Sequence, residues 1–321
     1  MKILLWHVHG SWTTAFVQGR HDYLLPVDAQ RSADGRGRAD TWEWPASARE
    51  VPVEALRDEE IDVVVLQREH EIDLVRRWLG REPGRDLPAV FLEHNTPKGD
   101  VPNTRHPMAD RDDIRVAHVT HFNRLFYDNG RAPTTVIEHG IVDPGYRYTG
   151  ELARAAVVIN EPVRRGRVTG TDLLPALSEA APLDVFGMKV AGLPAHLGLG
   201  PERLAVHEDV PQAAMHEQIA RRRVYVHPLR WTSLGLSLLE AMFLGMPVVV
   251  LASTEAIEAV PREAGVVSTN PETLRDAVRR LRADPGWAVT MGKHGRMAAA
   301  ARYGVERFLS DWDELLLEVT R

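Results

Sequence analysis

Short apolar runs rich in β-branched residues alternate with segments of helical periodicity along the chain. In the first half the runs are residues 2–8, 61–67, 88–93, 114–120 and 134–139. Runs of this length are typical of strands buried on both faces, and the helical segments between them supply the crossovers of parallel βαβ units. The first half therefore predicts one doubly wound, Rossmann-like sheet.

A second series of apolar runs follows the turn-rich segment 142–150. Its members are residues 155–160, 183–187, 203–208, 223–228, 246–252 and 265–268. A chain of 321 residues suits two domains better than one core. We therefore predict an α/β fold with two Rossmann-like domains facing a cleft, at residues 1–148 and 149–300. We also predict a C-terminal helix at residues 301–321 that can pack back on the first domain.

The composition is that of a soluble globular protein, with 44% hydrophobic and 26% charged residues. A net charge of -6 argues against nucleic acid as a partner, because neutralising phosphates needs an excess of Lys and Arg. The chain has no cysteine, and no apolar run reaches the length of about 18 residues that a transmembrane helix needs. We expect a cytoplasmic protein without a transmembrane segment.

The most informative segment is HPLRWTSLGLSLLEAMFLGMPVVV at 227–250, in which a strand end, a loop, a helix and a second strand follow one another. It resembles the retaining family 4 glycosyltransferases of the GT-B fold. Their pattern is two Glu residues separated by seven others, then a helix and Gly-x-Pro-Val-Val. Residues 136–143, 183–187 and the C-terminal tail are also similar to that family. The matching positions of the pattern are Glu240, Gly245, Pro247, Val248 and Val249.

The resemblance implies that the second domain binds a nucleotide-sugar donor. Glu240 would accept hydrogen bonds from the two ribose hydroxyls, which suits a carboxylate with two oxygens. A capping box formed by Ser237 and Glu240 is the structural alternative for the same residues. The leaving diphosphate requires cationic side chains or helix amides around it. The donor-binding residues are predicted to be Arg164, Arg165, Arg167, Gly187, Thr232, Ser233, Leu234, Gly235, Leu236 and Glu240.

Three positions depart from the family pattern. Thr232 stands where the first Glu of the pattern contacts the donor sugar, Thr169 where a Lys is usual, and His139 where the interdomain turn has Asn. The arginines at 164–167 can substitute for the missing Lys, although a charged run is also typical of a solvated turn. These departures leave the fold prediction intact and the donor sugar open.

The first domain offers histidines and a glycine where its predicted strands end. His9 and Gly10 follow the run 2–8, and His94 follows the run 88–93. The resemblance implies that these three residues are catalytic, with His94 contacting the acceptor or the transferring sugar. The alternative for both histidines is a structural role. The pair His7 and His9 has no third ligand close in sequence, so no metal site is expected. Mainly structural roles are expected for His7, His118 and His121.

These features predict a retaining glycosyltransferase that moves a sugar from a nucleotide-sugar donor to an acceptor hydroxyl. The donor, of the UDP or GDP type, is a substrate, and no cofactor is expected. The acceptor is a small molecule, a glycan or a lipid-linked compound. The resemblance implies that the leaving diphosphate serves as the base, and no carboxylate pair of the glycosidase kind is evident. Two alternatives stay open: a GT-B nucleotide-sugar epimerase, and a catalytically silent nucleotide-sugar-binding protein.

Overall fold

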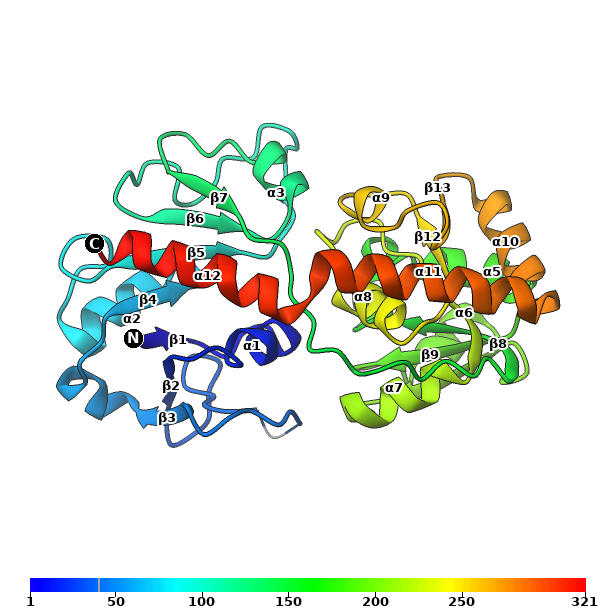
Figure 1. The fold of residues 1–321 in the computed structure, drawn as a ribbon, viewed down its shortest axis with the longest axis horizontal. Coiled ribbons are helices and arrows are strands. Elements are labelled where there is room, and N and C mark those ends of the chain that lie inside the picture. Colours follow the sequence, from blue (N-terminus) through cyan, green and yellow to red (C-terminus); the bar gives the residue numbers. More distant parts are fainter. Residues whose placement is uncertain (40) are drawn as a thin grey trace. The chain divides into compact units, whose positions relative to one another are not determined.

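The protein is described by a computed structural model that covers residues 1–39 and 41–321. It divides into two units, one formed by Met1–Val142 with Val305–Arg321 and the other by Asp143–Gly304. Both chain termini therefore belong to the first unit (Figure 1). Each unit is built on one parallel sheet, which confirms the predicted α/β fold class.

The first sheet has seven parallel strands in the order β3-β2-β1-β4-β5-β6-β7. The order runs outward in both directions from β1 and β4, as in a doubly wound sheet. The strands are β1 (Lys2–Leu5), β2 (Asp22–Val27), β3 (Ala48–Pro52), β4 (Val63–Leu66), β5 (Ala89–Glu93), β6 (Arg115–His118) and β7 (Thr134–Val136). The strands β2 and β3 are absent from the sequence-based prediction.

One face of this sheet is packed with alternate residues of adjacent strands. They belong to a single buried cluster that includes Leu4, Leu24, Val64, Phe91 and Val116. The amphipathic helix α2 (Glu71–Leu79) adds to the same cluster residues at helical spacing, namely Ile72, Val75 and Leu79. The other helices of the unit are α1 (Gly10–Phe16), α3 (His121–Phe126) and α12 (Val305–Val319), with the 3-10 helix η1 (Val53–Asp58).

The second sheet has six parallel strands in the order β10-β9-β8-β11-β12-β13, again doubly wound. They are β8 (Leu152–Val158), β9 (Leu183–Gly187), β10 (Leu204–Glu208), β11 (Arg222–His227), β12 (Val248–Leu251) and β13 (Gly265–Ser268). Its helices are α4 (Pro162–Arg165), α5 (Leu174–Ser178), α6 (Leu193–Leu197), α7 (Gln212–Ala220), α8 (Leu236–Phe243), α9 (Ala256–Ala259), α10 (Pro271–Ala283) and α11 (Pro285–Tyr303), with η2 (Gly166–Thr169) and η3 (Thr171–Leu173).

The units divide a few residues away from the boundaries predicted at 148 and 300. Residues 143–148 belong to the second unit because Asp143 forms an ion pair with Arg296 at 2.7 Å and the amide of Tyr148 donates to the carbonyl of Leu244 over 3.1 Å. The helix α11 continues to Tyr303 without a break. The helix α12 then packs against α1 in the first unit, as the red ribbon in Figure 1 shows.

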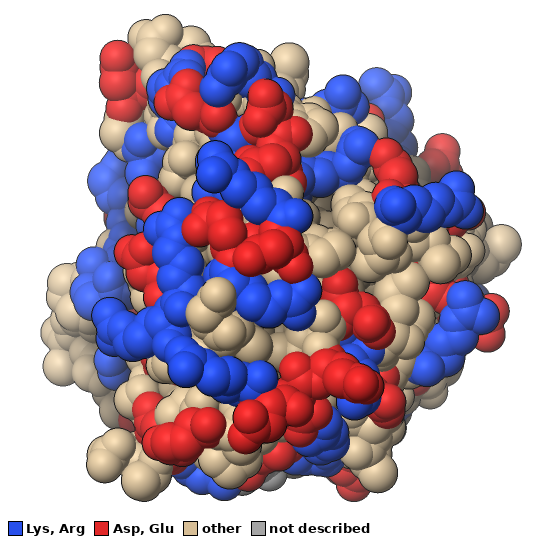
Figure 2. All heavy atoms as spheres, turned by 90° about the vertical axis from the view of Figure 1, so that its left-hand side faces the viewer, with Lys and Arg blue, Asp and Glu red and all other residues tan. Residues whose placement is uncertain are grey.

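Charges of both signs are interleaved on the face of the first unit shown in Figure 2. Many arginines of this unit are paired, such as Arg31 with Glu50 at 2.7 Å and Arg76 with Glu82 at 2.6 Å. This face thus lacks the concentrated positive charge that binding a nucleic-acid backbone requires. Within the described residues, no helix is long and apolar enough to cross a membrane.

Candidate functional site

The candidate site of the second unit lies at the carboxyl edge of its sheet, where three loops are hydrogen-bonded to one another. After β12, the Thr254 hydroxyl donates to the carbonyl of Thr232, in the loop after β11, over 2.6 Å. That loop is also tied to the loop after β8, because the amide of Arg230 donates to the carbonyl of Val168 over 2.9 Å. The structure thereby joins the two segments that were predicted separately to bind the donor.

Backbone strain is concentrated at the same edge. Five non-glycine residues of the described chain have a positive φ, and four of them follow strands of this sheet. These are Glu161 (φ 53°), Lys189 (55°), Asp209 (52°) and Thr254 (50°). A positive φ is unfavourable for residues with a side chain, and such strain persists where the surrounding structure enforces it, often at functional sites.

Gly187 ends β9 at a place where only glycine fits. Its φ is +141°, and a Cβ there would lie 2.0 Å from the carbonyl oxygen of Ile159. The missing side chain lets the loops after β8 and β9 approach each other closely. Gly187 therefore shapes this edge through its backbone.

The segment between β11 and α8 spans residues 228–235 and ends with Thr232, Ser233, Leu234 and Gly235, so that α8 begins at Leu236. Gly235 is the N-cap, and no side chain caps the helix. The capping box suggested for Ser237 and Glu240 is therefore wrong: Ser237 lies inside the helix, and its hydroxyl accepts a hydrogen bond from Tyr225 over 2.9 Å. An N-terminus without a side-chain cap presents backbone N–H groups that suit an anion.

Glu240 is a buried carboxylate that is 4% exposed. Its two oxygens have different partners on α7: the amide of Gln212 donates to Oε1 over 2.9 Å, and Nε2 of His216 lies 3.3 Å from Oε2. A buried carboxylate requires such donors, because losing water without replacement costs several kcal/mol. The arrangement holds the carboxylate of Glu240 in a defined orientation.

Thr232 presents a hydroxyl oxygen that is buried and has no hydrogen-bond partner in the part of the chain that the structure describes. Its carbonyl is held by Thr254, so the backbone at this position is fixed. An unsatisfied buried hydroxyl costs about 1–3 kcal/mol, which a ligand that supplies a partner would recover. This is the position where the family pattern has its first Glu.

Two of the three predicted phosphate-binding arginines are paired with acidic side chains. Arg164 donates through Nε to Glu161 over 2.9 Å, and Arg167 donates to Asp172 over 2.9 Å. Lys189, a cation that the sequence analysis did not select, lies 2.6 Å from Glu161. Hydrogen bonds from Arg164 and Lys189 lower the pKa of Glu161 to about 2. A bound diphosphate would therefore compete with carboxylates for these cations.

Three histidines of the first unit lie together where β1, β5 and β7 end. The rings of His9 and His94 are 3.9 Å apart between centroids, and His94 is stacked on His139 at 6.3 Å. Burial is the main cause that lowers the pKa of His9 to about 4 and that of His139 to about 3, and it holds the pKa of His94 well below its usual value. The cluster is therefore neutral at physiological pH. Neutral imidazoles can donate and accept hydrogen bonds without adding charge.

Gly10 is the first residue of α1 and lies under the indole of Trp42, where a Cβ would come within 2.2 Å of the ring. His7 also contacts these aromatic rings, with its own ring 6.1 Å from Trp42 and 4.9 Å from Trp44. The indole of Trp42 thus packs on Gly10, a contact that the sequence did not predict.

His118 is fully buried and bound to Asn129 at 2.9 Å.

Four residues of these sites were missed as site residues by sequence reasoning: His139, Lys189, Gln212 and His216. His139 was noted only as a departure from the family turn. Gln212 and His216 are four residues apart, a spacing that places them on one face of a helix. That signal was available, but the sequence does not indicate which side chain they face.

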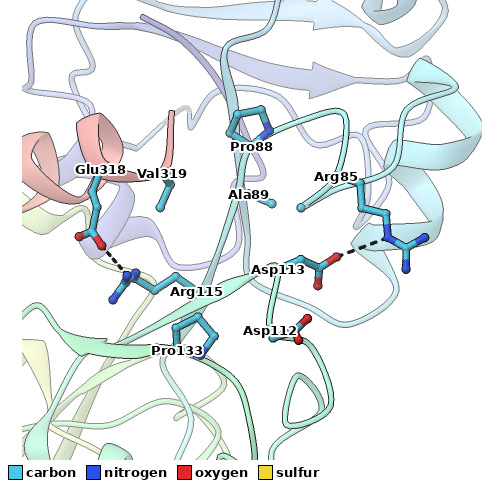
Figure 3. Close-up of a pocket in the computed structure, with 10 residues that line it drawn as sticks. Arg85, Pro88, Ala89, Asp112, Asp113, Arg115, Pro133, Glu318 and Val319 are labelled. Carbon is cyan, nitrogen blue, oxygen red and sulfur yellow. Dashed lines mark hydrogen bonds and ion pairs between the residues drawn. The ribbon is translucent and has the colours of Figure 1, made fainter. Parts of the chain in front are cut away.

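A cavity of about 280 Å³ lies elsewhere in the first unit, at the amino-terminal ends of β5 and β6 (Figure 3). Charged groups that line it are already paired, Arg115 with Glu318 at 2.5 Å and Arg85 with Asp113 at 3.7 Å. Ligands of open α/β sheets bind at the carboxyl ends of the strands, so this cavity is not the candidate site. In residues 1–39 and 41–321, no group of three or more His, Asp or Glu could hold a metal ion.

Residues 172–284, which include Gly187, the loop before α8 and Glu240, match the family described as Glycosyl transferases group 1. No curated protein matches the chain significantly in sequence.

Several solved structures share the fold of the chain. A sucrose-phosphate synthase from Thermosynechococcus elongatus is 16% identical, with a TM-score of 0.72 and 99% of each chain covered. HepE from Anabaena, solved in complex with UDP-glucose, is 14% identical, with a TM-score of 0.72 over 99% of this chain and 100% of HepE. A glycosyltransferase from Rickettsia africae is 12% identical, with a TM-score of 0.69 over 100% and 98% of the chains. These similarities show the GT-B fold, and the family match over residues 172–284 identifies the protein as a glycosyltransferase.

Proposed function

We propose that the protein is a retaining, family 4 type glycosyltransferase that uses a nucleoside-diphosphate sugar as donor and an acceptor hydroxyl. The observation that carries this proposal is Glu240, a buried carboxylate held by two side chains within the matched segment. A carboxylate has about four lone-pair sites, so Glu240 can accept two further hydrogen bonds from the vicinal hydroxyls of a ribose.

The diphosphate would bind next to that ribose, at the uncapped start of α8 and at the cations of the loops after β8 and β9. Its negative charge is best met by charge-assisted hydrogen bonds, which Arg164, Arg167 and Lys189 can supply once they exchange their carboxylate partners. HepE, which has the same fold, was solved with UDP-glucose, and this supports a UDP-type donor with a hexose. We propose no cofactor beside this substrate.

In the proposed step the bond between the sugar C1 and the diphosphate oxygen breaks, and a bond between C1 and the acceptor oxygen forms on the same face. The proton of the acceptor hydroxyl passes to the leaving diphosphate, so no side chain has to act as nucleophile. The neutral histidines His9, His94 and His139 suit hydrogen bonding to sugar or acceptor hydroxyls, because they add no charge to the first unit's site. The acceptor is proposed only as a hydroxyl compound.

The test is calorimetric binding of UDP, GDP, ADP and dTDP to the wild type and to Glu240→Gln. The amide replaces one acceptor oxygen with an NH₂ donor, so the preferred nucleotide should bind more weakly by about 1.5–3 kcal/mol, or at least about tenfold. Glu217→Gln on α7 is the matched control, since Glu217 is 71% exposed. Equal affinity of wild type and Glu240→Gln would remove the basis of the proposal. Retention is tested separately, by NMR of the anomeric proton of the first product formed.

A nucleotide-sugar-binding protein without transfer activity is the second candidate. Thr232 favours it, because a hydroxyl stands where the family pattern has a carboxylate for the donor sugar. Such a protein would bind the intact donor but release no nucleoside diphosphate from it with any acceptor. An epimerase, in contrast, would convert the donor sugar when no acceptor is added.

A further inference from the structure

Two side chains of α7 hold the carboxylate of Glu240 from the same direction. Gln212 and His216 are four residues apart and therefore lie on one face of the helix. Each contacts a different carboxylate oxygen, at 2.9 Å from the Gln212 amide and 3.3 Å from His216 Nε2. The carboxylate is thus fixed at both oxygens and cannot rotate without losing one of the two contacts.

His216 and Glu240 lie in the interior of the second unit, and Gln212 is partly buried. His216 is 7% exposed and Glu240 is 4% exposed, and α7 packs against α8. Nε2 of His216 must carry the proton in order to donate to the carboxylate, and the amide of Gln212 can only donate through its NH₂ group. Two of the lone pairs of Glu240 are therefore used by the protein, and one on each oxygen is left for a ligand.

We propose that Gln212 and His216 are positioning residues that make the site selective for ribonucleotides over 2′-deoxyribonucleotides. The inference rests on the proposed role of Glu240 in binding ribose. A vicinal diol needs both carboxylate oxygens presented in one plane, one for each hydroxyl. A carboxylate that is already held at both oxygens loses no conformational entropy when it binds the diol. A loosely held carboxylate loses entropy when it binds both hydroxyls, so that it binds a single hydroxyl nearly as well as two.

Selectivity follows from this geometry. When a 2′-deoxyribose binds, one oxygen of a fixed, buried carboxylate loses its partner and cannot turn toward another. When either positioning contact is lost, the carboxylate can rotate to follow the remaining 3′-hydroxyl. The ribonucleotide then binds more weakly, while the deoxyribonucleotide is affected little.

The experiment measures the affinities of UDP and 2′-deoxy-UDP, and of GDP and 2′-deoxy-GDP, by calorimetry. The variants are Gln212→Leu and His216→Phe, which remove one donor each at similar volume, and His216→Gln, which can return an N–H to the position of Nε2. Gln218→Leu is the matched control on α7, where the backbone carbonyl and not the side chain of Gln218 binds Arg222. Thermal melting of each variant shows that it is folded.

We expect the wild type to prefer the ribonucleotide by at least about tenfold. Gln212→Leu and His216→Phe should lower this ratio several-fold through the ribonucleotide alone, and His216→Gln should restore most of it. An unchanged ratio in Gln212→Leu, or an equal loss for both sugars, would overturn the inference. If the wild type binds none of these four nucleotides and neither ADP nor dTDP, the proposed function itself fails. If His216→Phe does not fold, the ratio of ribonucleotide to deoxyribonucleotide affinity in Gln212→Leu alone tests the inference.

Discussion

The hydroxyl of Thr254 donates to the backbone carbonyl of Thr232 over 2.6 Å. Thr254 has a φ of +50°, which is unfavourable for a β-branched residue. The backbone is therefore strained at Thr254, after β12, and the same residue fixes the loop that precedes α8.

Replacing Thr254 with Val should destabilise this loop, because the shape is kept and the hydrogen bond is lost. We expect the free energy of unfolding to fall by about 0.5–1.5 kcal/mol, and UDP to bind more weakly. Thr254→Ser keeps the hydroxyl and should behave like the wild type. Thr290→Val removes a comparable hydroxyl from α11, where Thr290 donates to the carbonyl of Gly286 over 3.0 Å, and should leave UDP binding unchanged. Urea unfolding and calorimetry give both values.

Removing Arg164 and Arg167 together should weaken UDP binding far more than uridine binding. Hydrogen bonds between charged groups contribute about 1.5–3 kcal/mol each, and only UDP has the phosphates to form them. Arg279→Ala is the control, because Arg279 forms an exposed ion pair with Asp276 on α10. The same loss of affinity for uridine as for UDP would contradict a role in diphosphate binding.

Stability should depend on pH through His139. Burial, the largest cause, lowers its pKa from 6.5 to about 3, so the folded protein keeps the ring neutral where the unfolded chain protonates it. Above the unfolded pKa the group adds no pH dependence. Below it, the free energy of unfolding should fall by up to about 1.4 kcal/mol per pH unit until the folded pKa is reached.

His139→Asn removes this proton difference and should make the decrease in stability toward acid pH shallower. The measurement is urea unfolding at about pH 7.5 and about pH 5.5 for the variant, the wild type and His121→Asn. His121 is exposed at the start of α3 and serves as the matched control. A decrease in His139→Asn as steep as that of the wild type would show that His139 is not one of the groups responsible.

Phe308→Ala should be the most destabilising of these substitutions. Phe308 is fully buried, and its ring lies 6.1 Å from that of Trp12 and covers the backbone of Gly140. Truncation of such a side chain costs about 3–5 kcal/mol. Leu317→Ala, on the same helix but 42% exposed, should cost much less. A loss for Phe308→Ala as small as that for Leu317→Ala would mean that α12 contributes little to the first unit's core.

The sequence was most informative where strands are buried on both faces. The strands β4 and β12 are both runs of Val, Val, Val and Leu, and such runs have few alternatives to a central parallel strand. The strands β2 and β3 were missed because β2 contains Pro26, and β3, with the sequence AREVP, is a polar edge strand. Proline and polar residues lower the strand signal. The edge position of β3 tolerates its polar residues, and Pro26 lies beyond the residues of β2 that pair with β1.

Candidate site residues could be named from the sequence when they lie at the end of a strand or belong to a continuous motif, as Gly187 and Glu240 do. The hydrogen-bond partners of Glu240, Gln212 and His216, could not be named from the sequence, because a contact between α7 and α8 depends on how the helices pack. The same limit applies to His139, which reaches His94 only through the order of β5 and β7 in the sheet. Turn composition also placed the boundary at 148, whereas the ion pair of Asp143 and Arg296 assigns the turn to the second unit.

Because α12 belongs to the first unit, part of the core of that unit is synthesised only after the whole second unit. Trp12 and Phe16 pack against Trp312, with ring centroids 5.6 and 5.0 Å apart. The entire second unit, Asp143–Gly304, is synthesised between these partners. At about 5–20 residues per second, the nascent first unit spends on the order of ten seconds or more with this aromatic surface uncovered. The core of the first unit therefore begins to form during translation without α12, and it is completed only after α12 has been synthesised.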